Sequence, residues 1–373
     1  MFNFKKIITM VSSIILSTPQ ASAQTNHYEE AWTFWRLGQH EEALKEFNEA
    51  IKQNPDDTSA NLNKGVLLKQ LGRYKEALKT YDILIKKEPD YAVAYSNRGN
   101  VLSKLQRFEE AVNSYNKAIE LSPGTSSYIA DVYTGKGEAL MSMESFPEAL
   151  ESFNMAIQKN PNSAGAYFDK GLVLTKMDKS KEEIIESYSL AIQHRPDFAE
   201  AYCEKGLALQ EFGRLEDALI SYDLAIKYKP DHASAYHNKA TALLELGNLE
   251  EAIIECDLAI KYRPDFADSH FNKASALAAL GKMEEAIEEY DLAIKYDPNY
   301  SYNYFKKAIS LGDIGKFEEA IVELDKAIKL QPNEPGYYHG KGLALNILGR
   351  AEEAHEALKK FEELGGDLAK EKN

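Results

Sequence analysis

The sequence is poor in cysteine and proline. Its 373 residues include two cysteines and 12 prolines, while 44% of the residues are hydrophobic and 28% are charged. A chain of this composition can bury enough apolar surface to fold. This excludes a disordered protein and fits a soluble globular or repeat protein.

The chain also lacks an excess of positive charge. Lysine and arginine number 44 against 59 aspartates and glutamates, which gives a formal net charge of −15. This balance argues against a nucleic-acid backbone or an anionic membrane surface as the partner. The acidic residues are dispersed among lysines, so a solvated helical surface explains them most simply, and a basic partner stays open.

The first 23 residues differ from the rest of the chain. MFNFKK is short and basic, IITMVSSIIL is apolar, and STPQASA ends in small residues. This order is typical of a secretory signal peptide, so we expect export, to the periplasm or outside the cell, with cleavage after Ala23. The apolar run is short for a membrane span. Membrane contact is therefore expected only if this segment stays uncleaved.

Nearly identical segments recur along the chain at a fixed interval. YDLAIKYKPD at 222–231 returns as CDLAIKYRPD at 256–265 and as YDLAIKYDPN at 290–299. Prolines close successive repeats at Pro55, Pro89, Pro123, Pro161, Pro196, Pro230, Pro264, Pro298 and Pro332. The interval is 34 residues, except for 38 before Pro161 and 35 before Pro196. A segment that recurs in this way indicates a stacked structural unit.

Each repeat carries the pattern of two amphipathic helices. In residues 199–231, apolar or small residues recur at spacings of three and four, at Tyr202, Gly206 and Leu209 and then at Ala218, Leu219, Tyr222, Ala225 and Ile226. These spacings place each set on one helical face. Gly213 is expected to end the first helix and Pro230 to end the second.

Ten repeats share small and aromatic residues at fixed positions. The eighth position is glycine or alanine in all ten, the twentieth is alanine in nine, and the twenty-fourth is aromatic in seven. We expect the two helices to cross closely at the small residues, with the aromatic ring beside the crossing. This 34-residue helix–turn–helix pattern resembles the tetratricopeptide repeat.

The resemblance implies an all-α fold, a right-handed superhelical solenoid of antiparallel helix pairs whose first helices line a concave groove. The ten repeats are expected near residues 24–57, 58–91, 92–125, 130–163, 164–198, 199–232, 233–266, 267–300, 301–334 and 335–368, followed by a polar tail at 369–373. One repeat cannot fold alone, because ordering its backbone costs about 1–2 kcal/mol per residue. Neighbouring repeats must therefore cover each other.

Two repeats depart from the pattern. Four extra residues precede Pro161, around GTSSYIADV, and one extra residue lies in MDKSKEEI, where Ile184 takes the place of alanine. We expect an irregular junction after the third repeat, where a hinge is one reading. The alternative is that the first helix of the fourth repeat is longer by about one turn.

In this family, fixed positions of the first helices point into the groove. Here the sixth position holds Asn63, Asn97, Asn238 and Asn272. They resemble fragments of the asparagine ladder with which some family members bind the backbone of an extended peptide. Ordinary polar surface is the alternative, because Asp169, Glu204 and Lys306 interrupt the series. Cys203 is expected on the groove and Cys256 in the core, on different helices, so we expect no disulfide between them.

Apolar residues are also frequent at groove positions: Leu62, Val66, Phe168, Leu172, Leu207, Phe271, Phe305 and Ile309. Exposed apolar residues on such a face usually indicate a partner, and packing between neighbouring first helices is the alternative. Trp32 and Trp35 share one helical face in the first repeat. They are expected either to anchor a partner or to cover the end of the array.

Charged residues predict ion pairs between repeats. The seventh position is basic in nine repeats, and the twenty-fifth holds Asp82, Asp223, Asp257, Asp291 and Asp325. We expect each aspartate to pair with the basic residue of the next repeat, as Asp223 with Lys239. Such pairs would fix the stacking register while contributing only about 0–1 kcal/mol each.

The sequence offers no arrangement for catalysis. GYYHGKG at 336–342 differs from a phosphate-binding loop, because its glycines are one residue too close. His232, His237 and His270 lie on neighbouring repeats without the spacing of metal ligands. The family's carboxylate-binding set is missing too, since Tyr28 and Trp32 stand where it has lysine and asparagine. We expect no cofactor, no metal and no small-molecule substrate.

The sequence thus predicts an exported, non-catalytic scaffold or adaptor that binds proteins or extended peptide segments in its groove. The alternative is a structural envelope-assembly factor that associates through its convex face or its ends. An enzyme is a distant third.

Overall fold

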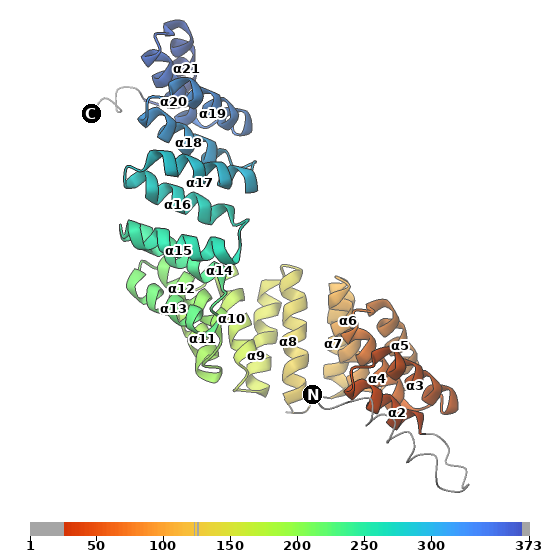
Figure 1. The fold of residues 1–373 in the computed structure, drawn as a ribbon. Coiled ribbons are helices and arrows are strands. Elements are labelled where there is room, and N and C mark those ends of the chain that lie inside the picture. Colours follow the sequence, from red (N-terminus) through yellow and green to blue (C-terminus); the bar gives the residue numbers. More distant parts are fainter. Residues whose placement is uncertain (1–25, 123, 125–126, 368–373) are drawn as a thin grey trace, which may run out of the picture. The chain divides into compact units, whose positions relative to one another are not determined.

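Every regular element that the structure describes is an α-helix. The computed structural model describes residues 26–122, 124 and 127–367. Over these residues the chain forms twenty helices and no strand (Figure 1). The predicted signal peptide with its cleavage position after Ala23, and the predicted tail at 369–373, lie outside the described residues.

The helices form ten pairs, each with a first and a second helix. The first helices are α2 (His27–Arg36), α4 (Thr58–Gln70), α6 (Ala92–Lys104), α8 (Ser127–Ser142), α10 (Ala164–Lys176), α12 (Ala199–Glu211), α14 (Ala233–Glu245), α16 (Ala267–Ala279), α18 (Ser301–Asp313) and α20 (Pro335–Ile347). The second helices are α3 (His40–Gln53), α5 (Tyr74–Lys87), α7 (Phe108–Leu121), α9 (Phe146–Lys159), α11 (Lys181–His194), α13 (Leu215–Tyr228), α15 (Leu249–Tyr262), α17 (Met283–Tyr296), α19 (Phe317–Leu330) and α21 (Ala351–Glu363).

The chain divides into two compact bodies, Met1–Pro161 and Asn162–Asn373, which we call the N-terminal and the C-terminal body. Within each body a helix packs against the helices that precede and follow it in the chain. Successive first helices also touch, as α16 touches α18 and α18 touches α20. Each body is therefore a stack of helix pairs, the solenoid arrangement in which each repeat contacts its neighbours.

The two helices of a repeat cross where a small residue faces an aromatic ring. Tyr81 of α5 is fully buried, and a Cβ atom added to Gly65 of α4 would lie 2.5 Å from its Cε1 atom. Ala77, at the twentieth position of the same repeat, is fully buried as well. A larger residue at position 65 would force the helices apart. The predicted close crossing is confirmed.

The two irregular repeats adapt without losing their helix pairs. Helix α8 has 16 residues, three more than α4 or α6, and α7 packs directly against it. The extra residues therefore lengthen the first helix, which is the alternative raised from the sequence. Residues 123, 125 and 126 of this junction lie outside the described residues, so an irregularity there stays a prediction. In the fifth repeat Asp178 adopts a φ of 49° at the turn, and Ile184 is buried in place of alanine.

None of the described helices is both long enough and apolar enough to span a bilayer.

Candidate functional site

The predicted ion pairs between repeats are present. Asp223, Asp257, Asp291 and Asp325 each place Oδ1 2.6 to 2.8 Å from Nζ of the lysine at the seventh position of the next repeat, and Asp82 places Oδ1 2.7 Å from Nε of Arg98. Several of these lysines have a second partner that sequence reasoning missed. Lys239 also binds Glu255 at 2.7 Å, and Lys273 binds Glu289 at 2.6 Å. Lys239 and Lys273 thus each join the preceding repeat to the second helix of their own repeat.

The pKa values of these lysines depend on the acidic partners. Burial disfavours the charged ammonium group of Lys239, but hydrogen bonds to Asp223 and Glu255 outweigh it and raise the pKa. Lys64 and Lys205 occupy the same position in repeats that follow Asn48 and Ser189 instead of aspartate. Burial there lowers the lysine pKa. Where the acidic partners are present, they therefore offset the effect of burial on the pKa of the lysine.

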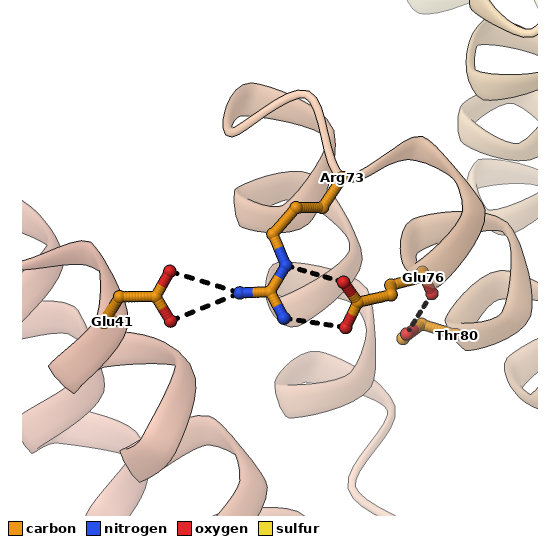
Figure 2. Close-up of polar contacts among 4 residues, drawn as sticks. All are labelled: Glu41, Arg73, Glu76 and Thr80. Atoms are coloured by element: carbon orange, nitrogen blue, oxygen red, sulfur yellow. Dashed lines mark hydrogen bonds and ion pairs between the residues drawn. The ribbon is translucent and has the colours of Figure 1, made fainter.

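An arginine links repeats in the N-terminal body in a similar way. Arg73 lies between two carboxylates (Figure 2). Its Nε and Nη2 atoms donate to the two carboxylate oxygens of Glu76 at 2.7 Å, while Nη1 donates to both oxygens of Glu41 at 3.2 Å. Glu41 belongs to α3 and Glu76 to α5, so this forked contact ties the second helices of the first two repeats together.

The asparagines of the sixth position join neighbouring first helices. The amide nitrogen of Asn63 donates to the Tyr28 hydroxyl at 2.8 Å, and that of Asn272 donates to the Thr241 hydroxyl at 2.9 Å. Asn238 donates to Sγ of Cys203 at 3.6 Å. Asn97 is half-buried. Three of the four amides therefore serve lateral packing, and recognition of a peptide backbone by these residues stays a prediction.

The cysteines are both buried and unpaired. Burial raises the pKa of each thiol to about 12. Cys203 is only 4% exposed. The expectation that it lines the groove is therefore wrong, because the next first helix covers it and its sulfur accepts the hydrogen bond from Asn238.

The tryptophans of the first repeat stack on each other. The ring centroids of Trp32 and Trp35 are 4.9 Å apart, with an angle of 18° between the planes. Trp35 also packs edge-on against Phe47, and its indole nitrogen donates to Gln70 of α4 at 3.1 Å. Trp35 thus covers the core of the first two repeats. Whether the pair also anchors a partner stays a prediction.

The predicted apolar residues of the fifth and sixth repeats are half-buried. Phe168 packs against Phe198 at 4.8 Å and Tyr188 at 5.9 Å between ring centroids. Leu172 and Leu207 are half-buried as well. In this part of the C-terminal body, packing between helices accounts for Phe168.

The apolar face of α16, α18 and α20 is different. We call it the first-helix face. Phe271, Tyr302 and Phe305 form a chain of rings, with centroids 5.7 Å apart between Phe271 and Tyr302 and 5.8 Å apart between Tyr302 and Phe305. Phe305 in turn packs against Tyr337 at 5.0 Å. Tyr302, at the second position of its repeat, was not singled out from the sequence.

Two hollows adjoin at Phe305. The aliphatic hollow has a volume of about 370 Å³ and is lined by Phe305, Ile309, Leu343 and Ile347 together with Phe317 and Leu324 of the second helix. The tyrosine hollow has a volume of about 340 Å³ and is lined by Tyr300, Tyr302, Phe305 and Tyr337. The exposed fractions are 43% for Ile309, 48% for Leu343 and 61% for Ile347. Phe305 and Ile309 were predicted, whereas Leu343 and Ile347 occupy groove positions of the tenth repeat that the sequence reading left out.

Small residues open the aliphatic hollow. Gly312 of α18 and Gly340 of α20 both line it. A Cβ atom at Gly312 would meet no atom within 4 Å, and one at Gly340 would lie 3.4 Å from Leu324. Lysine, asparagine, glutamine or leucine occupies these positions in several other repeats. The hollow therefore exists because two side chains are missing from the helix surface.

A polar hollow lies in the N-terminal body. It has a volume of about 460 Å³ and is lined by Lys69, Asn100, Lys104, Tyr115 and Glu138, among others. The Tyr115 hydroxyl donates to Oδ1 of Asn100 at 2.8 Å. Burial and the nearby charge of Lys104 lower the pKa of Lys69. The sequence reading did not single out this hollow, which combines polar groove positions of three repeats.

The histidines named from the sequence do not converge. Nδ1 of His237 bonds to the Ser269 hydroxyl at 3.0 Å, whereas His270 bonds to Glu289 at 2.7 Å and to the carbonyl oxygen of Pro264 at 3.1 Å. One other group, His27, Glu30 and Glu46 of the first repeat, brings ligand-type atoms within 4.8 Å of one another. There Nδ1 of His27 and Oε2 of Glu46 are 2.6 Å apart and form a hydrogen bond.

Comparison with known proteins agrees with the repeat architecture. Tetratricopeptide repeat models match residues 28–92, 203–261 and 305–368, and also 92–124 and 267–300. A tetratricopeptide repeat protein from Parabacteroides merdae is 16% identical, with a TM-score of 0.51 over 67% of this chain and 97% of that one. No curated protein sequence matches.

Two further solved structures are similar over about half of this chain. YrrB, described as a TPR protein with an unusual peptide-binding site, is 27% identical over 52% of this chain and 97% of YrrB, with a TM-score of 0.43. MamA is 25% identical over 45% of this chain and 96% of MamA, with a TM-score of 0.41. The repeat models together match more than half of the sequence, and the described helices pair throughout, so this chain belongs to the tetratricopeptide repeat family.

Proposed function

We propose that this chain is an exported, non-catalytic scaffold that binds a protein or peptide segment on the first-helix face of its C-terminal body. The observation that carries the proposal is the pair of adjoining hollows at Phe305. Tetratricopeptide repeats are protein-interaction modules, which supports a protein as the partner. Export rests on the signal-peptide pattern of residues 1–23.

The exposed apolar residues of this face have a physical cost in water. Ile309, Leu343 and Ile347 lie close to one another around one hollow instead of being scattered singly. Covering apolar surface is worth about 25 cal/mol per Å². Clustered exposed residues of this kind mark binding sites, and a buried aromatic residue at the centre usually contributes most of the affinity. Phe305 holds that central place here.

A second candidate uses the second helices. Ile220 and Ile254, at equivalent positions of α13 and α15, are each 59% exposed, and Val322 of α19 is 53% exposed. This row favours the alternative of an assembly factor that associates through the outer face. The two hollows at Phe305 involve none of these three residues, so we rank this candidate second.

Filling the aliphatic hollow tests the proposal. Gly312→Leu would place a side chain in the hollow, starting from a Cβ position that has no other atom within 4 Å, and it replaces glycine within a helix. Proteins captured and cross-linked to the full-length chain in its native envelope should be lost with this variant and retained with Gly312→Ala. A partner that stays bound to Gly312→Leu as tightly as to the unaltered chain would contradict the proposal.

A further inference from the structure

Each hollow of the first-helix face contains one carboxylate without a partner. Asp313 lines the aliphatic hollow and Glu334 lines the tyrosine hollow. Among the described residues, neither carboxylate takes part in a side-chain hydrogen bond or an ion pair. No lysine, arginine or histidine lines either hollow within the described part of the chain. Each hollow therefore has one acidic residue and no basic residue among the described residues that line it.

The lysines of α18 do not neutralise these carboxylates. Lys306 extends over the ring of Tyr302, with Nζ 5.4 Å from the centroid. Lys307 is held by Asp291 at 2.7 Å and by Glu323 at 3.0 Å. Asp325 on the neighbouring second helix is likewise paired, with Lys341. Neither lysine of α18 forms an ion pair with Asp313 or Glu334, so both carboxylates stay available to a ligand.

An incoming segment would meet apolar surface and negative charge together. Apolar side chains of the segment can enter the hollows. A charged side chain next to them then lies close to the carboxylate of that hollow, Asp313 or Glu334. A carboxylate in the ligand would be repelled, since like charges brought together at an interface are unfavourable. The formal net charge of −15 acts in the same direction at longer range and speeds the approach of a cation.

We infer that the occupant of the first-helix face is a cationic apolar segment, with aliphatic or aromatic side chains for the hollows and a lysine or arginine next to them for Asp313 and Glu334. This inference rests on the proposed function and adds the chemistry of the partner. The charge selects the partner, while the apolar contacts supply most of the affinity. Binding is accordingly expected to weaken with salt without disappearing.

The test uses synthetic peptides of defined charge. Two fluorescently labelled twelve-residue peptides share the same leucine and phenylalanine positions, with lysine at the remaining positions in one and glutamate in the other. Binding to the full-length chain is measured by fluorescence anisotropy at low and high salt. The lysine peptide should bind at least tenfold more tightly than the glutamate peptide at low salt, and Gly312→Leu should weaken its binding.

Two double variants separate the carboxylates of the hollows from the overall charge. Asp313→Asn/Glu334→Gln removes the two acids of the hollows and should weaken the lysine peptide by roughly three- to tenfold. Asp231→Asn/Glu288→Gln removes the same charge from two exposed acids on a turn and on a second helix. This matched control should leave the affinity within about twofold.

The outcomes distinguish the two claims. Equal affinity of the two double variants for the lysine peptide would overturn the inference about the partner's charge, and so would equal binding of the two peptides to the unaltered chain. If Gly312→Leu still weakened binding in those cases, the proposed apolar site would stand. If Gly312→Leu had no effect either, both claims would fail. Unfolding curves of all variants check that each remains folded.

Discussion

A Cβ atom added to Gly206 would lie 2.6 Å from the Cε1 atom of Tyr222. The tyrosine is fully buried on α13 and packs directly against the backbone of α12. Equivalent glycine–ring contacts occur in the second, third, fourth and fifth repeats. The two helices of these repeats can thus approach so closely because glycine has no Cβ atom.

Gly206→Ala should therefore destabilise the chain by about 1–3 kcal/mol, because the added methyl group overpacks the crossing. Gly312→Ala is the matched control, since its Cβ meets no atom within 4 Å. That substitution should be neutral or stabilising by up to about 1 kcal/mol, as expected for glycine replaced within a helix. Urea unfolding measures both. If Gly206→Ala left the free energy of unfolding unchanged, the Tyr222 ring would be able to move aside, and the prediction of overpacking would be wrong.

The seventh repeat suggests a second substitution that should offset the cost of Gly206→Ala. It has Ala240 and Cys256 at the positions equivalent to Gly206 and Tyr222. In a Tyr222→Cys background, Gly206→Ala should cost less than in the unaltered chain, because the smaller side chain leaves room for the methyl group. A double-mutant cycle measures this coupling. Additive effects would contradict a direct contact as the cause.

A missing ion pair can be added to the array. Lys205 follows Ser189 instead of aspartate, and burial lowers its pKa. Ser189→Asp should place a carboxylate beside it, raise the pKa of Lys205 and stabilise the fold by up to about 1 kcal/mol. NMR titration of the lysine gives the pKa. An unchanged value would mean that the repeats differ in register at this junction.

Acid should destabilise the eighth repeat through Glu289. Burial acts to raise the pKa of this carboxyl group, but hydrogen bonds from His270 and Lys273 outweigh it and lower the pKa below its usual 4.5. A group with a depressed pKa in the folded state contributes stability above its unfolded pKa. That contribution is lost as the pH falls through the lower folded value.

Glu289→Gln should consequently lower the free energy of unfolding at neutral pH and flatten its decline as the pH falls below about 5, relative to the unaltered chain. The measurement is the urea midpoint as a function of pH. Glu288→Gln, at the exposed neighbouring position, serves as the control and should leave the acid limb unchanged. Parallel curves for Glu289→Gln and the unaltered chain would contradict the assignment.

The sequence predicted the helix pairs, the close crossings and the ion pairs, because each follows from residues at fixed positions in many copies. Asp223 and Lys239 are 16 residues apart, and their contact requires only the repeat period. The second partner Glu255 escaped notice because its position holds serine, threonine or alanine in most other repeats. Comparing the residues that most repeats share does not reveal a contact that only a few repeats make.

The site was harder to predict for the same reason. Phe305 and Ile309 were identified as groove residues, but the hollow around them depends on what Gly312 and Gly340 lack. Residues at equivalent positions also have different roles. Cys203 and Phe271 both occupy the fifth position, yet the first is covered by a neighbouring helix while the second is only half-buried. Such differences arise from side-chain packing between repeats, which periodicity does not encode.

The central claim is that a partner occupies the first-helix face, and a photo-reactive amino acid placed at two matched positions tests it most directly. Ile347 lines the aliphatic hollow and is 61% exposed, and Ile220 on the second helix α13 is 59% exposed. Irradiation of cells that produce each variant should yield a specific cross-linked partner from position 347 and none from position 220. A partner cross-linked from position 220 and absent from position 347 would contradict the account and favour binding through the second helices.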